Sequence, residues 1–105
     1  MTQGDNGIDV IVTYREKLIL IQCKNTETPI NVAFVRIFES AISRFSPDSL
    51  GIIVYNSEKL NEKFATPKAI NWTSTSKKNI KICSEKEFVK IIKTFSILMM
   101  MIILN

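Results

Sequence analysis

The sequence predicts a single layered α/β domain in which helices pack on a mixed central β-sheet. Three patterns lead to this prediction: a β-hairpin opens the chain, an amphipathic helix follows it, and apolar strand-like runs then alternate with helical segments. The chain has 105 residues, of which 46% are hydrophobic, and this is enough for one domain with a sizeable core. We expect this domain to occupy residues 1–94 and an apolar C-terminal tail to occupy residues 95–105.

The first expected element is the hairpin. Ile8 to Tyr14 is rich in β-branched residues, Arg15 to Lys17 is a polar turn, and Leu18 to Lys24 is a second apolar run. Neither run alternates cleanly between polar and apolar residues. Strands of this kind are usually covered on both faces, so we expect both to be central in the sheet.

A helix is expected next, with Asn31 as its N-cap. Its apolar residues recur at the spacing that places them on one face of a helix: Val32, Val35, Phe38, Ala41, Ile42 and Phe45. The run from Leu50 to Asn56 then predicts a third, buried strand.

The segment 57–79 has the least regular pattern and predicts a short helix or turn interrupted at Pro67. Ile80 to Ser84 predicts a fourth strand. Ser84 also begins a capping box with Glu87, which marks the start of a last helix.

Composition narrows the classes of function. The net charge of +4 and a pI of about 9.2 suit a polyanionic partner such as nucleic acid. The sequence contains no histidine, which excludes histidine-based zinc sites and Ser/Cys–His catalysis. Cys23 and Cys83 alternate with apolar residues and are expected to be buried, reduced thiols. With no secretory signal at the start, we expect an intracellular protein.

The C-terminal tail is nearly all apolar but shorter than the roughly 20 residues that a membrane-spanning helix needs. We therefore expect no stable membrane span. A continuous apolar surface of this kind needs a cover, so we expect a homodimer or another covering partner.

Three polar residues interrupt the apolar hairpin, at Asp9, Gln22 and Lys24. A two-residue loop at positions 15–16 would place Asp9 opposite Gln22, and a register shifted by two would place it opposite Lys24. Either register brings the three groups to one end of one face. Two readings remain open: an Asp9–Lys24 ion pair with Gln22 beside it, or a metal site that combines Asp9 with the Gln22 side chain and the Cys23 backbone carbonyl.

The segments "GDNGIDV" and "LILIQCKN" together resemble the core of the PD-(D/E)xK nucleases, and most closely their Mrr-like type IV restriction endonuclease branch. In that branch the pattern GDxGID precedes a strand, and a QxK strand follows, with Gln in place of the usual Asp or Glu. The matching positions are Gly4, Asp5, Gly7, Ile8, Asp9, Gln22, Cys23 and Lys24. The resemblance spans about residues 4–93 and implies a restriction-endonuclease-like fold.

The resemblance also implies a metal-dependent DNA endonuclease that uses Mg²⁺ or Mn²⁺. Asp9 would be the metal-binding carboxylate, Gln22 the second active-site position and Lys24 the catalytic lysine. Gly4 and Gly7 would allow the backbone to approach a phosphate closely. Related nucleases begin with a helix before the first strand, and the six residues before Gly7 are too few to form it.

A second basic region is a further candidate for DNA contact. Lys77 and Lys78 lie near Trp72 and could bind phosphate beside a stacking aromatic ring, or they could form only a solvated turn. Three functions therefore remain: the metal-dependent endonuclease, a non-catalytic DNA-binding module of the same fold, and an interaction protein that uses the apolar tail.

Overall fold

A computed structural model describes residues 8–14, 16–60 and 62–91 of the chain. Four strands form one sheet in the order β1-β2-β3-β4, and they comprise Val10–Tyr14, Lys17–Lys24, Leu50–Tyr55 and Asn79–Ser84. The β1 strand is antiparallel to β2, whereas β2, β3 and β4 are parallel to one another. The predicted mixed sheet with a hairpin at its start is confirmed.

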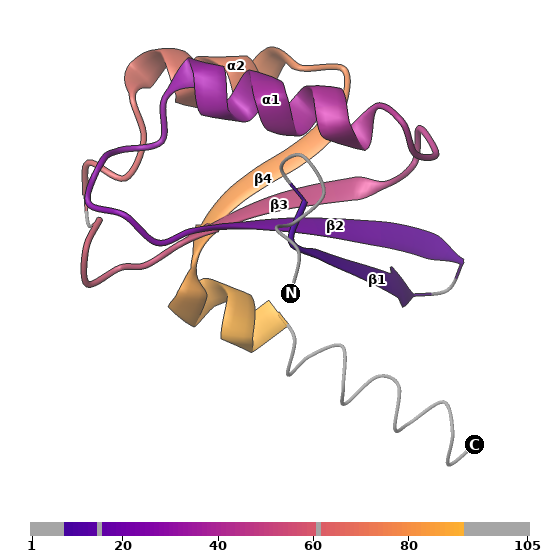
Figure 1. Cartoon of the computed structure of the whole chain (residues 1–105), viewed down its shortest axis with the longest axis horizontal. Coiled ribbons are helices and arrows are strands. Elements are labelled where there is room, and N and C mark those ends of the chain that lie inside the picture. Colours follow the sequence, from indigo (N-terminus) through magenta and orange to yellow (C-terminus); the bar gives the residue numbers. More distant parts are fainter. Residues whose placement is uncertain (1–7, 15, 61, 92–105) are drawn as a thin grey trace.

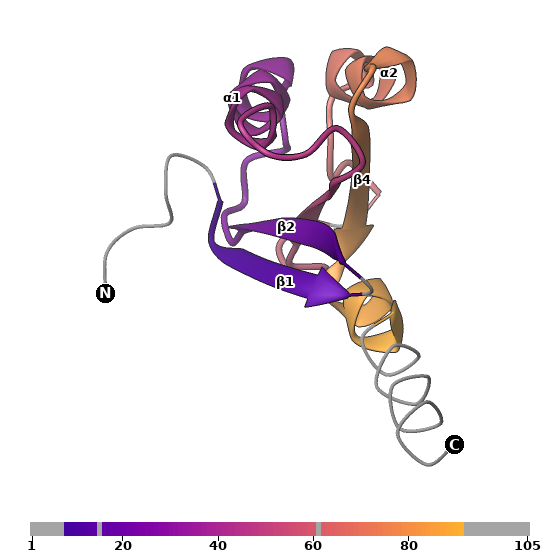
Figure 2. The same ribbon diagram turned by 90° about the vertical axis from the view of Figure 1, so that its right-hand side faces the viewer.

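Helices cover both faces of this sheet (Figure 1). The α1 helix (Val32–Ile42) connects β2 to β3, and α2 (Pro67–Thr75) connects β3 to β4. Both lie side by side on one face, as the view turned by 90° shows (Figure 2). Residues 85–91 form a helical segment on the opposite face. The layered α/β architecture is therefore also as predicted.

The apolar core has two parts, one on each face of the sheet. The larger part lies between the sheet and the helices α1 and α2, with Leu20, Phe38 and Ile53 at its centre. The smaller part contains Ile21 and Cys83 on the other face. As expected, β2 and β3 contribute buried residues to both parts.

The prediction that β1 is also covered on both faces is wrong. In the described part of the chain β1 has a neighbouring strand on one side only, so it is an edge strand. Val10 and Ile11 remain 46% and 50% exposed. A run of β-branched residues is typical of central strands, but the order of strands in the sheet decides what covers it.

The hairpin has the first of the two predicted registers. Tyr14 pairs with Lys17 and Ile11 pairs with Leu20, so the loop contains only residues 15 and 16. Glu16 has a φ of 68°, the left-handed conformation that tight two-residue hairpin turns require. Continued by one residue beyond the Val10–Ile21 pair, this register places Asp9 opposite Gln22.

The helix starts follow the capping residues in the sequence. The side chain of Asn31 accepts a hydrogen bond from the Phe34 N–H at 2.8 Å, as predicted for the N-cap of α1. Ser84 and Glu87 exchange the two bonds of a capping box, at 3.0 and 3.2 Å.

The prediction that Pro67 interrupts a helix is wrong. Pro67 begins α2 instead of breaking a helix, and Thr66 is the N-cap, accepting from the Ala69 N–H at 3.2 Å. The first turn of a helix leaves its backbone N–H groups unpaired, so the missing N–H of proline costs nothing there.

Two expectations fall outside the described residues. These are the apolar tail at residues 95–105, including the domain boundary before it, and the Gly-rich segment that contains Gly4 and Gly7. Among the described residues, no helix is long and apolar enough to span a membrane.

Candidate functional site

The parallel strands β2, β3 and β4 have their carboxyl ends on the same side of the sheet, which we call its carboxyl edge. Lys24 pairs with Tyr55, and Tyr55 pairs with Ser84, so these last residues of the three strands are level. Parallel α/β sheets characteristically bind ligands beyond the carboxyl ends of their strands. Gln22 and Lys24 lie at this end of β2.

Asp9 is held against the same end of β2 by two hydrogen bonds. Its backbone N–H donates to the Ile21 carbonyl at 2.7 Å, and its carboxylate Oδ2 accepts from the Cys23 N–H at 2.8 Å. Although the residue is exposed, these bonds hold its carboxylate beside Cys23. The second oxygen, Oδ1, has no hydrogen-bond partner within the described residues and is available to a ligand.

The side chain of Gln22 carries a buried oxygen atom. The side chain is half-buried, and its Oε1 is inaccessible to solvent with no hydrogen-bond partner in the described part of the protein. Leaving a buried acceptor unpaired costs about 1–3 kcal/mol. Native proteins rarely retain such a group without a cause, such as a bound ion or water.

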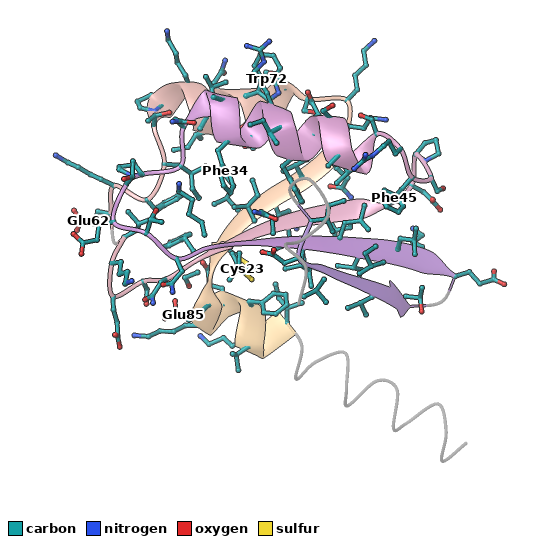
Figure 3. All side chains as sticks on the ribbon, viewed as in Figure 1. Cys23, Phe34, Phe45, Glu62, Trp72 and Glu85 are labelled. Atoms are coloured by element: carbon teal, nitrogen blue, oxygen red, sulfur yellow. The ribbon has the colours of Figure 1, made fainter. Side chains whose placement is uncertain are left out.

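Lys24 is positioned by an aromatic ring. Its Nζ lies 4.7 Å from the centroid of the Phe34 ring, at the start of α1, and Figure 3 shows Phe34 between that helix and the sheet. A cation over a ring face at this distance is attracted by the π electrons. Among the described side chains, no ion pair joins Lys24 to Asp9, so the predicted alternative of a buried Asp9–Lys24 pair does not form.

The direction of the Cys23 backbone matters for the predicted ligand set. Along a strand, the N–H and C=O of one residue point to the same side, and successive residues alternate sides. The Cys23 N–H points to Asp9, so its carbonyl is directed toward the same side, away from β3. The paired residues of β1 stop at Val10 opposite Ile21. The Cys23 carbonyl thus lies beyond the β1 ladder, on the side of β2 to which its N–H donates to Asp9.

These donors suit a hard cation. Asp9 Oδ1, Gln22 Oε1 and the Cys23 carbonyl are oxygen atoms of the kind that Mg²⁺ or Mn²⁺ prefers, with water completing the coordination. Only one of the three carries a charge. Over the residues that the structure covers, no three His, Cys, Asp or Glu side chains are grouped to hold a metal.

The thiol of Cys23 does not belong to this donor set. The prediction that both thiols are buried is wrong for Cys23, which is exposed, and correct for Cys83; both are free. The reason is the short β1 ladder, which ends before reaching Cys23. Partial burial of the sulfur and the nearby Asp9 carboxylate both raise the pKa of the Cys23 thiol, which favours its neutral form.

Lys77 and Lys78 are not part of the same site. They directly precede β4, whose first residue Asn79 pairs with Leu50 and is level with Ile19 on β2. Lys24 is five residues further along β2, about 16 Å at roughly 3.3 Å per residue. The two lysines therefore lie at the opposite edge of the sheet.

The aromatic ring expected to stack beside these lysines has other partners. The Trp72 indole N–H donates to the Glu39 carboxylate at 3.2 Å, and the Arg36 guanidinium lies 5.3 Å from the ring centroid. Trp72 thus links the two helices, and Arg36 covers one side of its ring.

Three further polar residues lie at the carboxyl ends of the parallel strands, and the sequence motifs do not include them. The first residues after β2, β3 and β4 are Asn25, Asn56 and Glu85, all at the edge that carries Lys24. Asn56 bonds to Asn25, and Glu85 accepts from the N–H and hydroxyl of Ser57 at 2.8 and 3.0 Å. Figure 3 shows Glu85 and Cys23 near this end of the sheet. The sequence pattern that could have indicated these three residues is a polar residue directly after a buried strand.

Comparison with known proteins identifies the family. A sequence model of the restriction endonuclease family, representing its Mrr-type catalytic domain, matches residues 1–92. The chain belongs to the Mrr-type restriction endonuclease family. No curated protein and no solved structure gives a significant match. The matched region contains Asp9, Gln22 and Lys24 together with all four strands, and the mixed sheet with flanking helices is the restriction-endonuclease-like fold. Membership in this family places the chain among nucleases, with DNA as the class of substrate.

Proposed function

We propose that the chain is a divalent-metal-dependent DNA endonuclease whose active site consists of Asp9, Gln22 and Lys24. The observation that carries this proposal is the buried Oε1 of Gln22, which has no hydrogen-bond partner among the described residues and belongs to the residue that the hairpin register places opposite the anchored Asp9. A protein that needed only a stable hairpin would gain by replacing that amide with an apolar group. An acceptor kept unpaired at a cost in stability is explained when a ligand uses it.

Asp9 Oδ1, Gln22 Oε1 and the Cys23 carbonyl would hold the cation, which we infer to be Mg²⁺ or Mn²⁺. When bound, such an ion neutralises phosphate charge and lowers the pKa of a water molecule. The hydrogen bond from the Cys23 N–H to Asp9 Oδ2 leaves Oδ1 as the oxygen that can coordinate.

Lys24 would supply positive charge to the phosphate that is cut. Its ammonium group has no carboxylate partner among the described residues, and the ring of Phe34 restrains it without neutralising it. A fixed cation of this kind stabilises the extra negative charge that develops on phosphate oxygens during hydrolysis. The net charge of +4 favours the approach of DNA as a whole.

Gly4 and Gly7 remain predicted positions for close approach of the backbone to phosphate. Lys77 and Lys78 remain predicted DNA contacts. Because they lie at the other edge of the sheet, they would bind the duplex at a point distant from the phosphate that is cut.

Nicking of supercoiled plasmid tests the proposal. The unsubstituted protein should relax plasmid in the presence of Mg²⁺ and not with EDTA, and Lys24→Ala should slow nicking by about 10²–10³-fold. Lys17→Ala is the matched control, because Lys17 is an exposed lysine at the other end of the same strand. Equal rates for the Lys24 and Lys17 variants would contradict the role given to Lys24.

A second candidate function is DNA binding without cleavage on the same fold. It is favoured by the single carboxylate among the described donors of the site. This alternative predicts salt-dependent DNA binding, no nicking with any divalent metal, and the loss of no more than one phosphate contact in Lys24→Ala.

A further inference from the structure

Asn25 and Asn56 occupy matching positions at the carboxyl edge of the sheet. Each is the first residue after a parallel strand, and they directly follow the paired residues Lys24 and Tyr55. The Asn56 Nδ2 group donates to Asn25 Oδ1 at 3.2 Å. The two amides thus connect the ends of β2 and β3 next to Lys24.

The orientation of both amides is determined by a backbone group. The Glu58 N–H donates to Asn56 Oδ1 at 2.8 Å. A backbone N–H can only donate, so Asn56 must turn its oxygen to Glu58 and its NH₂ group to Asn25. Asn25 must then turn its oxygen to Asn56, which leaves its own NH₂ group directed away from the pair. Asn25 is exposed, and within the described residues its Nδ2 has no partner.

We propose that Asn25 is a DNA-positioning residue, whose Nδ2 donates a hydrogen bond to a phosphate oxygen beside the phosphate that Lys24 contacts. This proposal rests on the proposed function. Phosphate oxygens only accept hydrogen bonds, so a site for phosphate needs a group held as a donor, and the chain of bonds from Glu58 holds Asn25 in that state. Its Cα is one residue from that of Lys24, about 3.8 Å away. Amide side chains are common donors to the DNA backbone.

Measurement of DNA affinity in EDTA separates this role from catalysis. With a fluorescent duplex of about 20 base pairs, Asn25→Ala should raise the Kd about tenfold, the loss expected for one hydrogen bond to a charged group. In Mg²⁺, the same variant should raise the KM for plasmid nicking and leave kcat within about twofold. Asn71→Ala is the matched control, since Asn71 is an exposed asparagine within α2 that belongs to neither proposed DNA contact, and its substitution should leave the Kd unchanged.

The Asn56→Asp variant tests the orientation. Its carboxylate still accepts from the Glu58 N–H but now offers oxygen to Asn25, which must turn its NH₂ group inward. The Kd should rise, and because the effect passes through Asn25, it should be clearly smaller in the Asn25→Ala background. Equal effects of Asn56→Asp in both backgrounds would mean that the added charge alone acts, which would overturn the orientation argument.

The outcomes distinguish this proposal from the one on which it rests. If the unsubstituted protein binds and nicks DNA while Asn25→Ala matches it in Kd and KM, the endonuclease assignment survives and the role of Asn25 is overturned. If the protein shows no DNA binding, both are overturned. A loss in Asn25→Ala that is equal on duplexes of different sequence supports a phosphate contact, and a loss confined to one sequence overturns it.

Discussion

Replacing Gln22 with leucine should make the protein more stable while it loses function. Gln22 lies on the face of β2 that also carries Leu18 and Leu20, and leucine is similar to glutamine in size without its amide. The substitution removes the buried Oε1, which has no hydrogen-bond partner among the residues that the structure describes. It therefore separates the cost of the unpaired oxygen from the shape of the core around it.

The expected magnitude comes from the burial of that oxygen. An unpaired buried acceptor costs about 1–3 kcal/mol. Because the Gln22 side chain is only half-buried, the substitution also removes polar surface in contact with water, and this loss offsets part of the gain. We expect a gain of about 1–2 kcal/mol in the free energy of unfolding without metal. For a chain of this length, that corresponds to a rise of roughly 4–8 °C or more in Tm.

The assay is urea unfolding in EDTA and again in Mg²⁺, with Ser49→Ala as the control. Ser49 has the other buried side-chain oxygen without a partner among the described residues, and it lies just before β3, away from the proposed metal ligands. A bound cation should stabilise the unsubstituted protein and Ser49→Ala by mass action but not Gln22→Leu. If Gln22→Leu is less stable than the unsubstituted protein in EDTA, or if Mg²⁺ stabilises both equally, then Gln22 Oε1 is not a costly oxygen kept for a metal.

Three further predictions concern packing, titration and charge. Gly51→Ala should cost about 1–3 kcal/mol in urea unfolding, because the added Cβ would lie 2.7 Å from Phe38 Cε2. Burial, and secondarily the Glu87 carboxylate, raise the pKa of Cys83 from 9.0 to about 11, so the folded state keeps this thiol protonated. The contribution of this thiol to the free energy of unfolding is present below about pH 9 and is lost as the pH rises toward 11. Cys83→Ala should flatten that part of a plot of unfolding free energy against pH, and an unchanged slope would contradict the assignment. Removing both Lys77 and Lys78 should reduce the salt dependence of DNA binding by about two phosphate contacts without changing kcat, and an unchanged salt slope would show that they are only a solvated turn.

The features predicted correctly depend on residues close together in the sequence. Asn31 and the Ser84–Glu87 pair begin helices through bonds to backbone groups three residues away, so the pattern contains the whole interaction. The hairpin register follows from a two-residue turn, and its continuation by one residue places Asp9 opposite Gln22.

The features that the sequence could not supply depend on which segments become neighbours. The β-branched residues of β1 look the same whether the strand is central or at the edge, and only the strand order leaves Ile11 exposed. Lys77 and Lys78 precede a strand parallel to β2, and the parallel direction places them at the edge opposite Lys24. The bond between Asn25 and Asn56 joins residues 31 apart in sequence, which no local pattern indicates.

The proposed metal site depends on the charge of Asp9, so its decisive test is Mg²⁺-dependent nicking of supercoiled plasmid by Asp9→Asn beside the unsubstituted protein. Asparagine keeps the shape of Asp9 and an oxygen that can accept from the Cys23 N–H, so the hairpin should remain intact while the charge of the site is lost. We expect the unsubstituted protein to nick plasmid with Mg²⁺ and the nicking rate of the variant to fall to the level seen in EDTA. Nicking by Asp9→Asn at the unsubstituted rate would contradict this expectation.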